Sequence, residues 1–209
     1  MGMIDINFSK FFDNNINLNF QTENDHLSFH DVAIPQQTHS ANVKFVTQPG
    51  LYDNVDGLIT SKKYKLKLMT RVADCVPIYL HDFKNDFYGL IHSGWRGTKN
   101  HIILNALDIF KNKGFSNFKN IKVFIGPHIK DCCYEVDWDV AQYFSFFKKN
   151  KKEKKWLLNL EKEIIFDCVT KGILYKNIKV ADICTFETMD YESFRRDGKK
   201  SKRMLGIIG

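Results

Sequence analysis

The chain has 209 residues, of which 44% are hydrophobic and 26% are charged, and its formal net charge is +7. This much apolar material supports a sizeable core and excludes an intrinsically disordered chain. No run of about 18 apolar residues occurs, so we expect no membrane-spanning helix. The N-terminus has no basic segment followed by an apolar one, and the five cysteines are irregularly spaced. Both features predict a reduced, cytoplasmic protein.

Strands and helices are predicted to alternate in the first half of the chain. Apolar and polar residues alternate at 64–70, which predicts a strand with one buried face. Apolar runs at 76–80 and 87–91 predict two further strands. Thr98 is expected to begin a helix that ends near Gly114, because its apolar residues recur at helical spacing.

The second half shows the same mixture. The elements predicted there are strands at 121–125, 178–183 and 203–208, and helices at about 140–147 and 156–169. No linker rich in Pro, Gly or Ser and no internal repeat divides the sequence. We therefore expect a single domain, residues 1–209, of the α/β or α+β class.

Much of the positive charge lies in one basic run at 148–155. Such a run can bind nucleic acid through its phosphates. It contains no aromatic or Arg residue that would stack on bases, so we interpret it as a solvated connection between helices. A nucleic-acid binder is the least favoured alternative, and no nucleic-acid partner is expected. The overall basicity favours an anionic small molecule instead.

Reactive side chains cluster where three predicted strands should end, at 37–40, 73–77 and 92–97. Two imidazoles and a thiolate, from His39, His92 and Cys75, are ligands that suit zinc. Three protein ligands leave a fourth position open, which is typical of catalytic sites. Their long spacing matches no short zinc motif, and a buried Cys or a satisfied His is the alternative interpretation.

Six segments together give a more specific indication. They are 37–40 (QTHS), 56–60 (DGLIT), 73–77 (ADCVP), 92–97 (HSGWRG), 126–129 (GPHI) running into 132–136 (CCYEV), and 182–185 (DICT) followed by 194–198 (FRRDG). In this order they resemble the multicopper polyphenol oxidase or laccase-domain family, whose members are described as purine nucleoside phosphorylases with adenosine deaminase activity. The resemblance covers about residues 36–208. The segment before it and the residues around Val72 and Tyr191 depart from the family pattern.

The resemblance implies a layered α/β/β/α sandwich with mixed sheets. It also implies that His39, Cys75 and His92 hold a metal, most often zinc, with copper the less favoured ion. The expected activity is phosphorolysis of adenosine, inosine, guanosine or methylthioadenosine to the base and a pentose 1-phosphate, together with deamination of adenosine. The partner would be this small-molecule substrate, and the chain a monomer or small homo-oligomer.

Catalytic roles are expected for the three ligands and for Asp74 or Asp56, whose carboxyl would carry protons. Guanidinium groups hold phosphate by paired hydrogen bonds, which suggests the three arginines Arg96, Arg195 and Arg196, with Arg96 favoured. The alternative for Arg195 and Arg196 is a structural ion pair with Asp197 or another carboxylate.

Three other residues are weaker candidates. His128 would contact the substrate. Cys132 and Cys133 are adjacent, and neighbouring side chains on an extended segment point to opposite faces. We therefore expect both to be structural.

Two alternative enzymes share these residues. Cys75 with a neighbouring His could be the nucleophile of an amide hydrolase, acting in peptidoglycan precursor editing as some relatives of the family do. Copper-dependent oxidation of phenols is less favoured, because a multicopper site needs many more His ligands.

Overall fold

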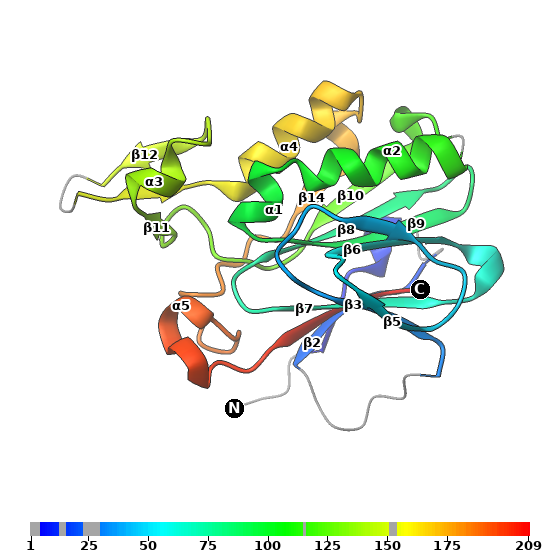
Figure 1. Ribbon diagram of the computed structural model, residues 1–209, viewed down its shortest axis with the longest axis horizontal. Coiled ribbons are helices and arrows are strands. Elements are labelled where there is room, and N and C mark those ends of the chain that lie inside the picture. Colours follow the sequence, from blue (N-terminus) through cyan, green and yellow to red (C-terminus); the bar gives the residue numbers. More distant parts are fainter. Residues whose placement is uncertain (1–4, 13–15, 23–29, 115, 151–153) are drawn as a thin grey trace.

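The computed structural model describes residues 5–12, 16–22, 30–114, 116–150 and 154–209, and two six-stranded sheets dominate it (Figure 1). The first sheet has the order β1 (Asp5–Asn7), β2 (Leu18–Thr22), β15 (Met204–Ile208), β7 (Lys67–Val72), β3 (Val32–Gln36), β5 (Gly50–Asp53). The second sheet has the order β14 (Ile178–Val180), β10 (Ile121–Ile125), β8 (Val76–Asp82), β9 (Phe87–Ser93), β6 (Gly57–Ser61), β4 (Val43–Phe45). Both sheets combine parallel and antiparallel pairs.

A third, small sheet consists of β11 (Glu135–Val136), β13 (Trp156–Leu158) and β12 (Phe147–Lys149). The α-helices are α1 (Trp95–Lys99), α2 (Ile102–Gly114), α3 (Trp138–Ala141), α4 (Leu160–Lys171) and α5 (Phe194–Asp197). Short 3-10 helices occur at Ser9–Phe12, Lys62–Tyr64, Phe118–Asn120, Tyr175–Asn177 and Gly198–Lys200. The expected layered α/β fold with mixed sheets is confirmed. No helix within the described ranges is long and apolar enough to cross a membrane.

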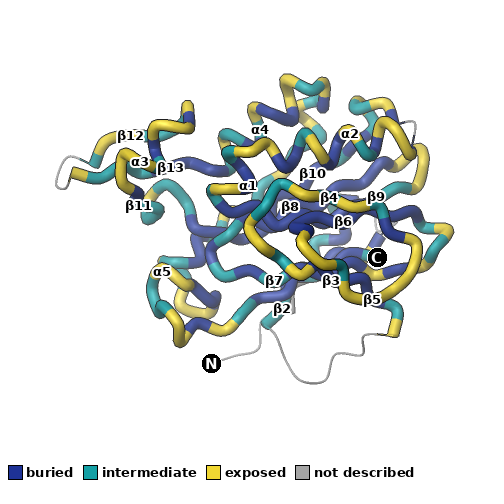
Figure 2. The backbone as a smooth tube through the Cα atoms, in the orientation of Figure 1, coloured by how far each residue is buried: buried dark blue, intermediate teal, exposed yellow. Residues whose placement is uncertain are grey.

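The core has two main parts, one on each face of the second sheet. Figure 2 shows the strand β8 of this sheet as buried. On one face α2 buries Ile103, Leu107 and Phe110, which recur at helical spacing, against the strands. On the other face Leu68 of β7 and Leu90 of β9 pack together between the two sheets. The second sheet is therefore covered on both sides, and its central strand β8 is buried along its whole length.

The helix predicted to begin at Thr98 is divided in two. Thr98 lies inside α1, and its hydroxyl lies 2.8 Å from Ser93 Oγ and donates to Gly94 O at 3.1 Å. His101 then takes a left-handed backbone with φ of 53°. This conformation interrupts helical hydrogen bonding, so α2 begins at Ile102 as a separate helix.

The helices predicted at 140–147 and 156–169 are partly wrong. The first ends at Ala141, and the second begins at Leu160 after the strand β13. The rings of Trp138 and Trp156 pack in a tilted arrangement with centroids 5.1 Å apart, and this tertiary contact favours a strand at 156–158 over the local helical pattern. Gly172 caps α4 in a left-handed conformation, with φ of 107°.

The basic run does not form a helix connection where it is described. Lys148 and Lys149 belong to β12, and Lys155 precedes β13, while residues 151–153 lie outside the described ranges. Lys155 forms an ion pair with Asp137 at 2.8 Å. The strand predictions at 121–125 and 203–208 are confirmed by β10 and β15, and the strand predicted at 64–70 begins later, at Lys67.

Replacing Phe110 by Ala should lower the free energy of unfolding by about 3–5 kcal/mol, because the ring is fully buried between α2 and the second sheet. Phe166→Ala is the matched control, since Phe166 on α4 is 55% exposed. It should cost less than about 1 kcal/mol. Urea denaturation followed by circular dichroism measures both values. Equal losses would contradict the assignment of α2 to the core.

Candidate metal centre

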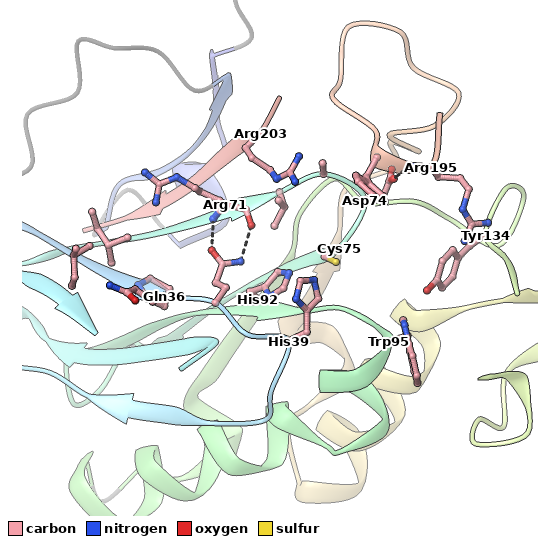
Figure 3. A pocket seen from close by; sticks show the side chains of 17 residues that line it. Gln36, His39, Arg71, Asp74, Cys75, His92, Trp95, Tyr134, Arg195 and Arg203 are labelled. Atoms are coloured by element: carbon pink, nitrogen blue, oxygen red, sulfur yellow. Dashed lines mark hydrogen bonds between the residues drawn. The ribbon is translucent and has the colours of Figure 1, made fainter. Parts of the chain in front are cut away.

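Three side chains from different parts of the chain meet at the ends of strands (Figure 3). His39 lies in the loop after β3, Cys75 in the turn between β7 and β8, and His92 near the end of β9. One ligand atom from each lies within 4.8 Å of the other two. The two imidazole rings are 4.9 Å apart between centroids and nearly perpendicular, at 82°. The structure therefore brings together the three residues that the sequence predicted as ligands.

The buried carboxylate of Asp56 holds two parts of this centre in place. Its Oδ1 lies 2.8 Å from Nδ1 of His92 and accepts a hydrogen bond from the N–H of His39 at 3.0 Å. Its Oδ2 accepts from the N–H groups of Thr38 at 3.1 Å and Ser40 at 2.7 Å. Burial alone would raise the pKa of Asp56, but hydrogen bonds from His92 and Ser40 lower it well below its usual range. In neutral His92 the proton therefore lies on Nδ1, which leaves Nε2 for a metal.

His39 has a left-handed backbone, with φ of 59°. A residue with a side chain pays roughly 1–3 kcal/mol for this conformation. The hydrogen bonds from residues 38–40 to Asp56 offset that cost, because they fix the loop in the one shape that points His39 toward Cys75. Asp56 therefore holds both imidazoles in position through these hydrogen bonds.

At Gly94 the backbone passes close to the side chains of Cys75 and His39. A Cβ atom there would lie 3.0 Å from Sγ of Cys75 and 3.3 Å from Cδ2 of His39. Any side chain at this position would therefore compete for the space between the ligands. Glycine at this position therefore lets the backbone pass close to the centre.

The charges of Cys75 and His92 are linked. Burial would raise the pKa of Cys75, but the adjacent His92 and His39 lower it to about 6. Burial would lower the pKa of His92, but the neighbouring Cys75 and Asp56 raise it to about 9. At neutral pH the two groups therefore form a thiolate–imidazolium pair.

This donor set fits a divalent metal ion. A thiolate and two imidazoles are borderline-soft ligands, and three protein ligands with one open side are typical of catalytic zinc. Asp56 supplies the carboxylate partner that metal-bound imidazoles usually have. His39 is exposed and Cys75 is half-buried, so the centre opens to solvent on one side.

A cavity of about 740 Å³ leads to the centre, and all three ligands line it. Figure 3 shows Arg71, Arg203 and Arg195 around the same cavity. Aromatic side chains also line it, from Trp95, Tyr134 and Phe194. A pocket with guanidinium groups and aromatic faces beside a metal centre is suited to an anionic or phosphorylated ligand that carries a flat ring.

Asp74 lines the cavity, but its carboxylate is engaged by protein groups. Oδ1 accepts a hydrogen bond from the Thr185 hydroxyl at 2.7 Å, and Oδ2 accepts from the backbone N–H of Arg195 at 2.6 Å. The backbone of Asp74 is also left-handed, with φ of 83°. Asp74 thus ties the turn that carries Cys75 to the segment that carries Arg195.

The arginines predicted to bind phosphate occupy different environments. Arg195 lines the cavity and lies over the ring of Tyr134, at 5.1 Å. Arg96 is exposed, lies over the ring of Trp95 and does not line the cavity. Arg196 donates to three backbone carbonyls and forms an ion pair with Asp197 at 2.8 Å, which is the structural alternative considered for it.

His128 is buried and does not line the cavity. Its Nδ1 lies 2.8 Å from the carbonyl oxygen of Gly126, and its Nε2 lies 3.3 Å from Glu161. Burial would raise the pKa of Glu161, but the bond to His128 lowers it. Both ring nitrogens are thus engaged by the fold.

Sequence reasoning did not select Arg71, Arg203 or Tyr134. Arg71 lies on β7, where Gln37 accepts a hydrogen bond from its backbone N–H at 2.9 Å and donates to its carbonyl at 2.8 Å (Figure 3). This reciprocal pair fixes the edge of the cavity. The signal available in the sequence was position alone, because Arg71 lies four residues before Cys75 and Tyr134 directly follows the paired cysteines.

Three comparisons with known proteins each found similarity over most of this chain. The family model described as multi-copper polyphenol oxidoreductase laccase matches residues 12–209. A purine nucleoside phosphorylase of Clostridium acetobutylicum is 34% identical, covering 98% of this chain and 92% of that protein. One of Aquifex aeolicus is 31% identical, covering 85% and 82%. The solved structure of the hypothetical protein YfiH of Bacillus licheniformis is similar with a TM-score of 0.86 and 26% identity, covering 94% of this chain and 93% of that one.

Asp56→Asn should weaken zinc binding by about 10–100-fold, because the amide cannot accept every hydrogen bond that now orients His39 and His92. Asp53→Asn is the control, since Asp53 is exposed at the end of β5. Chelator competition measures zinc affinity, and a far-ultraviolet circular dichroism spectrum checks folding. A folded Asp56→Asn protein that binds zinc as tightly as the parent would contradict the positioning role.

Proposed function

Because the chain belongs to the multi-copper polyphenol oxidoreductase laccase family, and relatives in it are named purine nucleoside phosphorylases, we propose that it is a zinc-dependent purine nucleoside phosphorylase with adenosine deaminase activity. One observation carries the proposal. The triad His39, Cys75 and His92 opens into a cavity that also presents arginine and aromatic side chains. These are the groups that a nucleoside and a phosphate require.

In phosphorolysis a phosphate oxygen attacks the anomeric carbon of the sugar as the bond to the purine nitrogen breaks. The phosphate becomes the ester of the pentose 1-phosphate, and the purine leaves with a proton. Arg71, Arg195 and Arg203 would bind and orient the phosphate, because their guanidinium groups carry positive charge at the cavity wall. Trp95 and Tyr134 would bind the purine between aromatic faces.

A zinc ion held by His39, Cys75 and His92 would supply Lewis-acid chemistry at this end of the cavity. In deamination, water replaces the amino group at C6 of adenine and ammonia leaves, so a nearby residue must carry protons. Asp74 is the carboxylate that lines the cavity, and its bonds to Thr185 and Arg195 make positioning its principal role. His39, the exposed ligand, lies where a substrate would enter.

The proposal is tested with purified zinc-loaded protein, adenosine or inosine, and phosphate. The expected products, separated by liquid chromatography, are adenine or hypoxanthine with ribose 1-phosphate, and inosine from adenosine alone. Omitting phosphate should remove the first products and leave deamination. No nucleoside conversion by a zinc-replete, folded sample would overturn the proposal.

Arg71→Ala and Arg203→Ala should each lower kcat/KM for phosphate by roughly 10–100-fold, because each removes a charge-assisted contact that contributes about 1.5–3 kcal/mol. Deamination of adenosine should change much less, since it uses no phosphate. Lys111→Ala, an exposed change on α2, is the control for lost surface charge. Equal losses in both reactions would show that the arginines support the fold and do not bind phosphate.

A second candidate is an amide hydrolase that uses Cys75 as its nucleophile, and the arrangement of Asp56, His92 and Cys75 favours it. A carboxylate orients an imidazole at 2.8 Å, and the imidazole lies beside a thiol, as in cysteine hydrolases. The lowered pKa of Cys75 is consistent with a reactive thiolate. Copper-dependent phenol oxidation gains less support, because the described part of the cavity offers a cluster of three ligands.

Iodoacetamide labelling separates the two candidates. In zinc-free protein Cys75 should alkylate with a rate that rises as pH passes about 6, since the thiolate is the reactive form. Zinc at saturation should suppress this labelling at least tenfold if Cys75 is a ligand. Mass spectrometry of peptides measures the extent of labelling at Cys75 with and without zinc. Unchanged labelling of Cys75 in zinc would favour the hydrolase.

A further inference from the structure

A second group of metal-ligating side chains lies outside the cavity, where the loop after β10 meets the segment that precedes α5. Its members are Cys132, Cys133, Cys184 and Glu187. One sulfur or carboxylate oxygen atom from each lies within 4.8 Å of all the others. Sγ of Cys132 is 3.4 Å from Oε2 of Glu187. All three cysteines are free thiols.

The adjacent cysteines converge because their segment is not extended. Residues 131–133 form a turn in which the N–H groups of Cys133 and Tyr134 both donate to the carbonyl of Lys130, at 3.0 and 2.8 Å. The rule that neighbouring side chains point to opposite faces holds for strands, so it does not apply here. The expectation that Cys132 and Cys133 are structural assumed an extended segment, whereas the structure has a turn there.

A second turn brings the other two ligands to the same place. Cys184 forms a bridge with His128, and the N–H of Thr185 donates to the carbonyl of His128 at 3.1 Å. The N–H of Thr188 then donates to the carbonyl of Cys184 at 3.0 Å, which turns the chain so that Glu187 returns toward the sulfurs. Backbone hydrogen bonds thus preform the cluster from two segments about 50 residues apart in sequence.

Three thiols and one carboxylate form a donor set that suits a soft, tetrahedral ion. Clustered thiolates repel one another, and a divalent cation removes that repulsion as the thiols lose their protons. The backbone N–H of Lys130 donates to Sγ of Cys184 at 3.5 Å, which helps to hold this sulfur in the cluster.

We propose that Cys132, Cys133, Cys184 and Glu187 form a second metal site, which binds zinc or another thiophilic divalent ion independently of the centre in the cavity. Cys184 is buried, whereas Cys132 and Glu187 are exposed, so the ion enters from the surface. The bound ion joins the loop of residues 131–134 to residues 184–187.

The site has a direct structural link to the cavity wall. Tyr134 follows Cys133 in the chain and lines the cavity. Arg196 donates to the carbonyls of Thr185 and Phe186, at 2.9 and 3.1 Å, directly after Cys184. An ion at the cluster would therefore fix the segments that carry Tyr134 and Arg195, and it would act on the cavity by positioning without contacting substrate.

The test removes the cavity centre by substituting Cys75, so that only the zinc bound at the second site is measured. Reduced Cys75→Ala protein is incubated with excess zinc, desalted and analysed for metal by mass spectrometry. It should retain one zinc per chain, and Cys75→Ala/Cys133→Ser should retain less than a tenth of that amount. Cys75→Ala/Cys168→Ala is the matched control, since Cys168 is buried in α4 away from the cluster, and it should retain one zinc. No zinc in Cys75→Ala, or equal zinc with and without Cys133, would overturn the second site.

A measurement on the parent protein covers the case in which a variant fails to fold. With a thiol-free reductant present, zinc should slow alkylation of Cys132 and Cys133 at least tenfold, as measured by peptide mass spectrometry. Equal alkylation rates with and without zinc would overturn the site, as would a disulfide between these cysteines that persists under the reductant. Neither result bears on nucleoside phosphorolysis, so the two proposals fail separately.

Discussion

The structure depends most on one buried carboxylate. Asp56, directly before β6, accepts hydrogen bonds from the loop of residues 38–40 and from His92 near the end of β9. These contacts join an irregular loop to a regular strand and hold His39 in a left-handed conformation that it would otherwise avoid. Without them, two of the three candidate ligands would lose their orientation. The geometry of the metal centre therefore rests on a residue that does not line the cavity.

Part of the fold could be predicted because local pattern and tertiary packing agree. The strand at 121–125 is apolar, is bounded by a turn and is buried between neighbours, so its limits were found from the sequence. Around Trp156, tertiary packing outweighs the helical pattern of the sequence. Pairing with β11 and contact with Trp138 give a strand there in place of the predicted helix. The break at His101 depends on one left-handed residue, for which helical spacing gives no signal.

The residues of the candidate site could likewise be predicted only in part. Ligand chemistry, strand ends and the family resemblance together selected His39, Cys75 and His92, which the structure brings together. Arg71 could not be selected, because its position at the cavity depends on how β7 sits beside the loop after β3. Side-chain direction also decides whether the other arginines line the cavity. Arg96 stacks on Trp95 outside the cavity, although it lies only four residues from a candidate ligand.

Zinc X-ray absorption most directly tests the claim that two imidazoles and one thiolate bind a metal at the cavity. The sample is Cys132→Ser/Cys133→Ser protein loaded with one equivalent of zinc, so that the cavity centre is measured alone. The account predicts one sulfur at about 2.3 Å and two imidazole nitrogens at about 2.0–2.1 Å. A folded sample that binds no zinc, or zinc without a sulfur ligand, would contradict it.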